Sequence, residues 1–115
     1  MRPVAAAVMT SLCLAGFARV AAAQEPDGAA VYQDECKSCH GVNGAPPARA
    51  REQYKKIKAL GDGGFVSSLS VDSIVTILKK GIDKDMKSFK SKLSDADMRA
   101  VAVYIKELAE KKKPS

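Results

Sequence analysis

Two cysteines and a histidine form the pattern with the clearest chemistry in this 115-residue chain. Cys36 and Cys39 are three positions apart, and His40 follows directly. This C-x-x-C-H spacing is typical of covalent c-type haem attachment. Two cysteines at this spacing can form thioethers with the vinyl groups of one porphyrin, and the next residue can bind the iron through its imidazole. The motif therefore predicts one covalently bound haem c, held by Cys36 and Cys39, with His40 as an iron ligand.

Three other kinds of site use some of the same residues. A structural zinc site needs about four ligands, mostly Cys or His, but His40 is the single histidine and Cys13 the single further cysteine. A thioredoxin-like redox pair also has C-x-x-C, beside a βαβ pattern, and this chain shows no strand-like alternation. A structural disulfide is the third alternative. The adjoining histidine favours haem attachment over all three.

The N-terminal residues have the pattern of a secretory signal peptide. A positive start at Met1-Arg2 precedes an apolar run over 4–17, and small residues end the segment at 21–23. This arrangement is typical of a signal with an A-x-A cleavage site. We therefore expect residues 1–23 to be removed by cleavage before Gln24.

An uncleaved membrane anchor fits this segment less well. A spanning helix needs about 20 apolar residues, and Arg19 interrupts the run early. Lipid attachment at Cys13 is disfavoured because the bulky Leu12 precedes it. The sequence thus predicts one domain over 24–115, exported to the periplasm and without stable membrane insertion.

The charge balance of the exported domain restricts its partners. Arg2 and Arg19 leave with the signal, so the 19 Lys and Arg of the full chain fall to 17 against 13 Asp and Glu, a net charge of about +4. A basic balance fits nucleic acid, an anionic membrane or an acidic protein. The chain has no nucleic-acid recognition motif and only 5% aromatic residues. We expect an acidic protein partner, no nucleic acid and a monomer.

Helical patterns position the motif. Residues 27–38 are compatible with a helix that Asp27 caps and that leads into the cysteines. A second helix is predicted over 71–80, because Ser70 is a suitable N-cap and Gly81 a suitable terminator. With no strand-like alternation between them, these segments predict an all-α domain.

The last helix has the strongest pattern. Ser94 and Asp97 have the spacing of a capping box. One apolar stripe follows, which is typical of a helix packed on a core: Met98, Val101, Ala102, Ile105, Leu108 and Ala109. Two long connections remain, over 41–64 with one short helix expected near 52–60, and over 81–93. Loops of this length in a small domain are usually functional.

The chain resembles the monohaem class I cytochromes c over nearly all of residues 24–113. Two segments carry the resemblance: Gly28-x-x-Val31-Tyr32-x-x-x-Cys36-Lys37-Ser38-Cys39-His40-Gly41 and Lys92-Leu93-Ser94-Asp95 leading to Val101-Ala102-Val103-Tyr104-Ile105. The resemblance implies a small cytochrome c fold, with three or more helices and long loops around one haem. It also implies that the first and last helices cross closely, with Gly28 and Tyr32 meeting the region of Tyr104.

The same resemblance implies a second iron ligand. The family uses a methionine in the loop before the last helix. Of the four methionines, Met1 and Met9 leave with the signal and Met98 belongs to the apolar stripe, which leaves Met86 in the expected loop. The family usually has proline after this methionine, and here the next residue is Lys87. A thioether opposite an imidazole would raise the reduction potential.

Further contacts to the haem are implied but not fixed. A downstream proline carbonyl often accepts the second ring N–H of the histidine in this family, and both Pro46 and Pro47 are candidates. Arg49, Arg51 and Tyr54 are near enough in sequence to reach the haem propionates, although a solvated loop explains them equally well.

Lysines crowd the segment around the expected methionine ligand. We call this set the lysine collar: Lys79, Lys80, Lys84, Lys87, Lys90 and Lys92. A solvated face would explain it. A cationic rim that steers an acidic redox partner would explain it as well, and electron-transfer contacts tend to be small and transient.

The resulting hypothesis is a periplasmic, low-spin electron carrier with His40 and Met86 as axial ligands, and not an enzyme. Two alternatives stay open. Without Met86 on the iron, the protein would bind a small ligand such as a gas or act as a weak peroxidase. In the other, it would be the cytochrome subunit of a periplasmic oxidoreductase complex.

Overall fold

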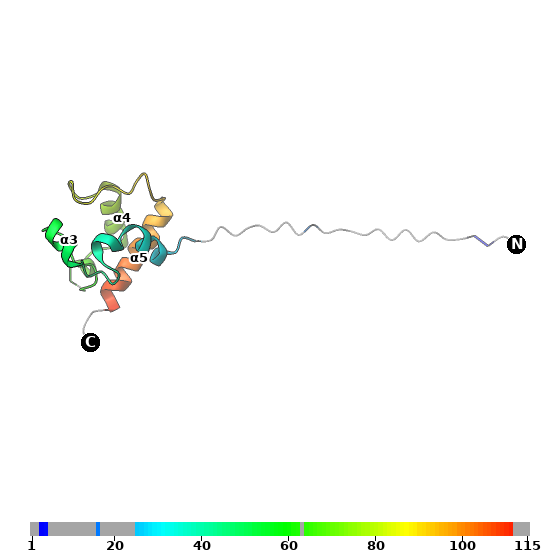
Figure 1. The fold of residues 1–115 in the computed structure, drawn as a ribbon. Coiled ribbons are helices and arrows are strands. Elements are labelled where there is room, and N and C mark those ends of the chain that lie inside the picture. The colour runs from blue at the N-terminus through cyan, green and yellow to red at the C-terminus, as the bar shows by residue number, and fades with distance from the viewer. Residues whose placement is uncertain (1–2, 5–15, 17–24, 63, 112–115) are drawn as a thin grey trace.

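The computed structural model describes residues 3–4, 16, 25–62 and 64–111 (Figure 1). The expected signal peptide lies outside the described residues except for three isolated positions, and so does its cleavage point before Gln24. The helices are α1 (Gly28–Glu35), α2 (Lys37–His40), α3 (Ala48–Gln53), the 3-10 helix η1 (Val66–Ser68), α4 (Val71–Lys80) and α5 (Asp95–Lys111). The described part contains no strand, so the fold is all-α as predicted.

The N-terminal helix is shorter than predicted. Its cap is the expected one, because the Asp27 carboxylate accepts the Ala29 N–H at 3.0 Å. The helix ends at Glu35, however, and Cys36 has φ −116° before α2 starts at Lys37. The expected helix over 27–38 is thus two helices with a break at the first cysteine.

The α4 helix has the predicted bounds and caps. Ser70 Oγ accepts the Ser73 N–H at 3.0 Å, and Gly81 ends the helix with φ +71°. That backbone conformation favours glycine because it has no Cβ. The face towards the interior consists of Ile74, Val75 and Leu78.

The α5 helix also confirms its prediction. Ser94 N–H donates to Asp97 Oδ2 and Asp97 N–H donates to Ser94 Oγ, each at 3.0 Å, which is the reciprocal pair of a capping box. All six residues of the apolar stripe are buried, and they form the centre of the hydrophobic core.

The first and last helices cross as the resemblance implied (Figure 1). A Cβ at Gly28 would lie 2.2 Å from the Ala100 carbonyl oxygen and 3.1 Å from Tyr104 Cβ. Only glycine permits this approach without a backbone shift. Beside the crossing, the rings of Tyr32 and Tyr104 have centroids 5.3 Å apart at 56°. The crossing fixes α1, and with it the start of the cysteine motif.

The connection after the motif differs from the prediction. The short helix α3 spans Ala48–Gln53, not 52–60, and starts directly after Pro47. A proline with φ −66° is pre-set for a helix start. Leu60 and Gly61 then donate backbone hydrogen bonds to the Gly44 carbonyl, at 2.8 and 3.2 Å, which closes this connection into a loop.

None of the helices within the described ranges has the length and apolar character needed to cross a membrane.

Candidate functional site

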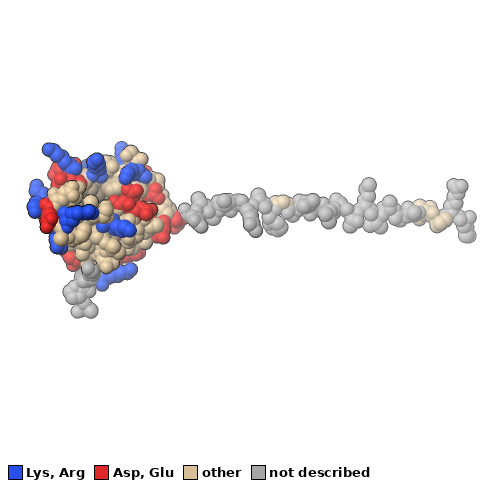
Figure 2. All heavy atoms as spheres, viewed as in Figure 1, with Lys and Arg blue, Asp and Glu red and all other residues tan. Residues whose placement is uncertain are grey.

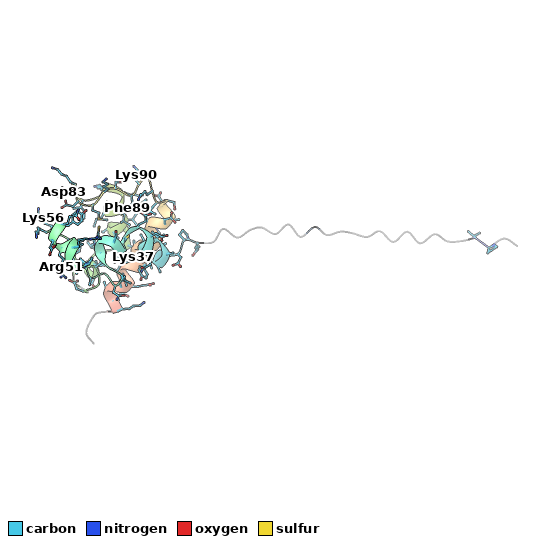
Figure 3. All side chains as sticks on the ribbon, viewed as in Figure 1. Lys37, Arg51, Lys56, Asp83, Phe89 and Lys90 are labelled. Carbon is cyan, nitrogen blue, oxygen red and sulfur yellow. The ribbon has the colours of Figure 1, made fainter. Side chains whose placement is uncertain are left out.

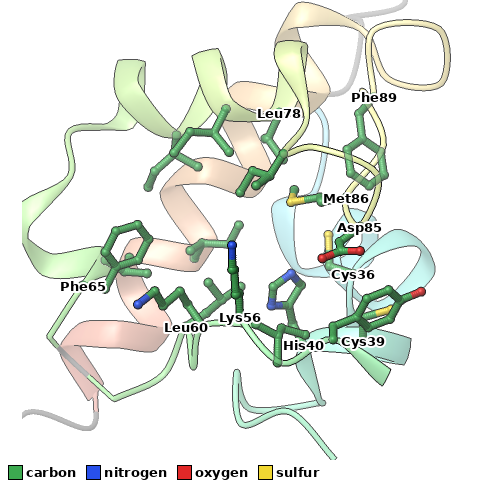
Figure 4. A pocket seen from close by; sticks show the side chains of 18 of the residues that line it. Cys36, Cys39, His40, Lys56, Leu60, Phe65, Leu78, Asp85, Met86 and Phe89 are labelled. Atoms are coloured by element: carbon green, nitrogen blue, oxygen red, sulfur yellow. The ribbon is translucent and has the colours of Figure 1, made fainter. Parts of the chain in front are cut away.

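A cavity of about 250 Å³ lies among α2, α4, α5 and the two long connections (Figure 4). Most of its lining is apolar, including Leu60, Val66, Ile74, Leu78 and Ile105. The four residues predicted to hold the haem also line it: Cys36, Cys39, His40 and Met86. Chain segments 46 residues apart in the sequence, at His40 and Met86, thus contribute to one cavity.

The short helix α2 brings the attachment motif to the cavity. Cys39 and His40 donate their backbone N–H groups to the Cys36 carbonyl, at 3.3 and 2.9 Å. One helical turn therefore starts at the first cysteine and ends at the histidine. Cys36 is buried and Cys39 half-buried, and both are free thiols.

Burial also sets the protonation of the first thiol. It raises the pKa of Cys36 to about 11, and the charges of Glu35 and Cys39 add to this shift. The thiol is therefore protonated near neutral pH, whereas reactive redox cysteines have a lowered pKa. This shift argues against the thioredoxin-like alternative. Within the described ranges, no three His, Cys, Asp or Glu side chains group together as a metal site would require.

The imidazole of His40 is half-buried at the cavity. Burial lowers its pKa, and the Lys58 carbonyl partly opposes that shift. The ring is therefore neutral near pH 7, which is the form that binds metals. Its Nδ1 is buried and has no hydrogen-bond partner among the described residues, so the Lys58 carbonyl lies outside hydrogen-bond geometry.

Neither proline carbonyl accepts a hydrogen bond from that nitrogen. No hydrogen bond joins Pro46 or Pro47 to His40 among the described residues. The Pro46 carbonyl instead accepts a hydrogen bond from Arg51 Nη1 at 3.3 Å. The basic side chain expected to reach a propionate therefore braces the loop after the motif.

Met86 lies in a tight loop beside the end of α4. Its N–H donates to the Ile82 carbonyl at 3.1 Å and its carbonyl accepts the Ile82 N–H at 2.7 Å, an isolated antiparallel bridge. Asp83 has φ +47° in the intervening turn. A Cβ at Gly81 would lie 2.5 Å from the Met86 carbonyl oxygen. These contacts fix the backbone on which the thioether is carried.

Two more hydrogen bonds tie this loop to α4. Phe89 N–H donates to the Leu78 carbonyl at 2.8 Å, and the Ser88 hydroxyl donates to the Lys79 carbonyl. Met86 is half-buried and packs against the core. Figure 4 shows its thioether and the His40 imidazole pointing into the same cavity from different parts of the chain.

The rim contains charged residues that the sequence reasoning missed. Lys56 and Lys58 line the cavity, as does the predicted Tyr54, whereas Arg49 and Arg51 do not. Lys56 extends into the cavity (Figure 4), and Lys58 Nζ lies 5.7 Å from the centroid of the Phe65 ring. Their exposed positions in a loop without helical or strand periodicity gave no sequence signal.

The lysine collar is interleaved with carboxylates. Lys79 pairs with Asp95 at 3.1 Å and Lys92 with Glu35 at 3.2 Å. Three carboxylates line the cavity together with Lys87: Glu35, Asp83 and Asp85. Figures 2 and 3 show both signs of charge side by side over this face. The rim of the cavity therefore carries both positive and negative side chains, whereas the lysines alone suggested a positive rim.

These side chains fit a covalently bound haem. The cavity is mostly apolar and has two free thiols at one end, one helical turn from a neutral, half-buried imidazole whose buried Nδ1 has no hydrogen-bond partner among the described residues. The thioether of Met86 also lines the cavity and is a soft group that could bind a haem iron.

Comparisons with known proteins agree with this chemistry. The family described as "Cytochrome C oxidase, cbb3-type, subunit III" matches residues 23–105. Cytochrome c6 of Microcystis aeruginosa is 36% identical over 85 residues, covering 74% of this chain and 98% of that protein. A cytochrome c6-like protein of Nostoc sp. is 32% identical over 85 residues, covering 74% and 71%.

The fold has solved counterparts as well. The KustC0563 c-type cytochrome superposes with a TM-score of 0.64 at 26% identity, covering 71% of this chain and 96% of that one. The superposition therefore extends over nearly the whole of that cytochrome and over 71% of this chain.

Proposed function

This chain belongs to the monohaem class I c-type cytochromes, and on that premise we propose that it carries single electrons through a haem iron bound by His40 and Met86. The family implies covalently bound haem c. The observation that carries the proposal is that both side chains line one cavity beside the two free thiols of the attachment motif.

Haem c, when bound, supplies a one-electron couple at its iron. The chain supplies the rest. Cys36 and Cys39 anchor the group, His40 offers a neutral imidazole from the end of α2, and Met86 offers a thioether from the loop. Ligation by both an imidazole and a thioether would favour the ferrous state, and the apolar lining of the cavity would exclude water from the bound group. We therefore propose an electron carrier and not an enzyme.

The replacement of the usual proline by Lys87 is compatible with ligation by Met86. Proline would restrict the backbone after the methionine. Here the bridge between Ile82 and Met86 and the contact of Gly81 with the Met86 carbonyl restrict it instead. These constraints support a persistent thioether ligand over an open sixth position on the iron. The alternatives of gas binding, weak peroxidase activity or service as a complex subunit are not favoured.

Redox partners would meet the protein at the rim of this cavity. We propose that the unpaired part of the lysine collar, with Lys56 and Lys58, steers an acidic surface on the partner. The carboxylates of Asp83 and Asp85 would limit the strength of that attraction, which suits a short-lived contact of a monomeric carrier.

Export is part of the same proposal. Residues 1–23 would act as a cleaved signal peptide, and residues 24–115 would form the periplasmic cytochrome domain. Mass spectrometry of the purified holoprotein tests this, because cleavage before Gln24 and attachment of one haem define a single mass. A chain that retains residues 1–23 would contradict the proposal.

The axial ligands are tested by absorption spectra of the oxidised and reduced protein and of two variants. Met86→Ala should keep the covalent haem and lose the weak long-wavelength methionine–iron band of the oxidised form. Met98→Leu is the matched control, because Met98 is buried in the core on α5 and does not line the cavity.

The band should persist in Met98→Leu. A high-spin spectrum in the unmodified protein that responds readily to carbon monoxide and does not change in Met86→Ala would contradict ligation by Met86. It would then favour the ligand-binding alternative.

A further inference from the structure

Tyr32 is the largest fully buried side chain in the described structure, with 0% of its surface exposed. It comes from α1 and packs its ring on Tyr104 of α5, at the helix crossing. Packing alone explains an aromatic ring at this position. It does not explain a phenol, because burying a hydroxyl is unfavourable unless it is hydrogen-bonded.

The hydroxyl has a specific partner. Tyr32 Oη donates to the carbonyl of Gly41 at 2.7 Å, a buried hydrogen bond to the residue directly after His40. The Gly44 N–H donates to the same carbonyl at a longer 3.3 Å. Burial raises the pKa of the Tyr32 phenol far above its usual range, so the hydroxyl remains a donor near neutral pH.

The backbone of the same residue holds the other end of the motif. The carbonyl of Tyr32 accepts the Cys36 N–H at 2.9 Å. Tyr32 is thus bonded to the first residue of the haem-attachment turn through its main chain and to the residue after the turn through its side chain. No other residue in the described part of the chain has hydrogen bonds to both ends.

Gly41, at the end of the turn, has a restricted backbone conformation. Gly41 has φ +81°, and a Cβ there would lie 1.9 Å from the Ala45 carbonyl oxygen. Its N–H donates to the Lys37 carbonyl at 2.8 Å. The Gly41 carbonyl is one Cα away from the His40–Gly41 peptide unit, and because the φ of Gly41 is restricted, the position of this carbonyl constrains the backbone that carries the imidazole.

The imidazole itself lacks the usual second contact. In most haem and metal proteins the other ring N–H of a ligating histidine is hydrogen-bonded, which fixes the ring. Nδ1 of His40 has no such partner among the described residues. The Lys58 carbonyl lies near the ring but does not meet hydrogen-bond geometry, so the backbone that carries His40 contributes to the orientation of the ring.

We propose that Tyr32 is a positioning residue for His40: its hydroxyl, by holding the Gly41 carbonyl, sets the orientation in which the imidazole meets the iron. This rests on the proposed ligation by His40. It assigns to the Tyr32 hydroxyl a role beyond the packing of the two helices.

The test compares two variants that each remove one hydroxyl from the same ring pair. Tyr32→Phe keeps the ring and removes the donor to Gly41. Tyr104→Phe keeps the ring contact, and Tyr104 has no side-chain hydrogen bond among the described residues. The readout is the set of hyperfine-shifted haem methyl signals in the NMR spectrum of the oxidised holoprotein, which report the orientation of the axial ligands.

The expected result is a changed order or spread of the methyl signals in Tyr32→Phe and an unchanged set in Tyr104→Phe. Rescue of the original signals is not expected from Tyr32→Trp, which cannot place a donor at the same point. Signals that are unchanged in Tyr32→Phe, or that change equally in Tyr104→Phe, would overturn the proposal.

The unmodified protein provides a second measurement if Tyr32→Phe yields no holoprotein. The Tyr32 hydroxyl proton should give a slowly exchanging NMR signal with a contact to Gly41, and a rapidly exchanging hydroxyl would overturn the proposal. A high-spin spectrum of the unmodified protein would instead contradict the axial ligation, so the two failures are distinguishable.

Discussion

The two sides of the cavity hold the two proposed iron ligands in different ways. His40 ends a helical turn that is bonded at both ends to the buried Tyr32. Met86 lies in an exposed loop whose neighbours Asp85 and Lys87 are open to solvent, and its position depends on backbone bonds to Ile82. Segments with exposed hydrogen bonds and few buried contacts open more easily. The backbone that carries His40 is therefore the more constrained of the two, and the position of Met86 is the one that should change more easily.

Removal of the histidine should have the largest effect. His40→Ala takes away the one imidazole of the chain and the ligand nearest both attachment cysteines. We expect an almost complete loss of low-spin holoprotein, measured by the reduced absorption spectrum per mole of chain. A normal yield of low-spin protein would mean that another residue serves as ligand and would remove the basis of the comparison.

Removal of the methionine should lower the reduction potential without loss of the covalent haem. In Met86→Ala the covalent attachment through Cys36 and Cys39 should remain, and the reduction potential should fall because the thioether no longer favours the ferrous state. Axial ligands span roughly 0.8 V of potential, and a redox titration would place the variant within that range. An unchanged reduction potential would argue that Met86 does not bind the haem iron.

A change to the loop backbone should displace Met86 and the two residues after it. In Gly81→Ala the new Cβ meets the Met86 carbonyl, and φ +71° is unfavourable for alanine. A cost of about 1–3 kcal/mol is typical of such overpacking, so the methionine–iron band should weaken and unfolding should begin at lower temperature. Gly64→Ala is the control, because its Cβ would meet nothing closer than 3.6 Å. Equal effects in both variants would show that the loop bonds do not hold the ligand.

Charge on the rim should have the smallest effect. Lys87→Glu places a negative charge beside Met86, whereas Lys111→Glu makes the same change at the far end of α5. We expect the first to slow electron transfer from an acidic partner by about tenfold or less at low salt, and the second to slow it far less. Stopped-flow measurements over a range of salt concentrations test this, and identical rates for the two variants would argue for a merely solvated collar.

Much of this molecule could be predicted from local sequence. The caps at Ser70 and Ser94 and the apolar stripe of α5 depend on neighbours within a few residues, and the structure confirms them. The C-x-x-C-H spacing is equally local, because the turn that closes it is a single turn of helix. Patterns of this kind predict an element wherever the surrounding protein does not override them.

The remainder depends on contacts between distant segments. The connection after the motif closes on Gly44 through hydrogen bonds from Leu60 and Gly61, which lie 16 and 17 residues further along the chain. The hydrogen bond of Tyr32 to Gly41 joins two helices through a side chain that the resemblance treats as packing. Lys56 and Lys58 reach the cavity only because this loop returns to it. Sequence periodicity has no signal for such contacts.

The contact at Gly28 has a consequence for the order of events during synthesis. This glycine lies against Ala100 and Tyr104, so α1 cannot be seated until the first half of α5 has been made and has reached the same compartment. The chain is synthesised from the N-terminus. The cysteine motif therefore precedes the helix on which α1 packs, and on the proposed export both thiols would be accessible for haem attachment before that packing forms.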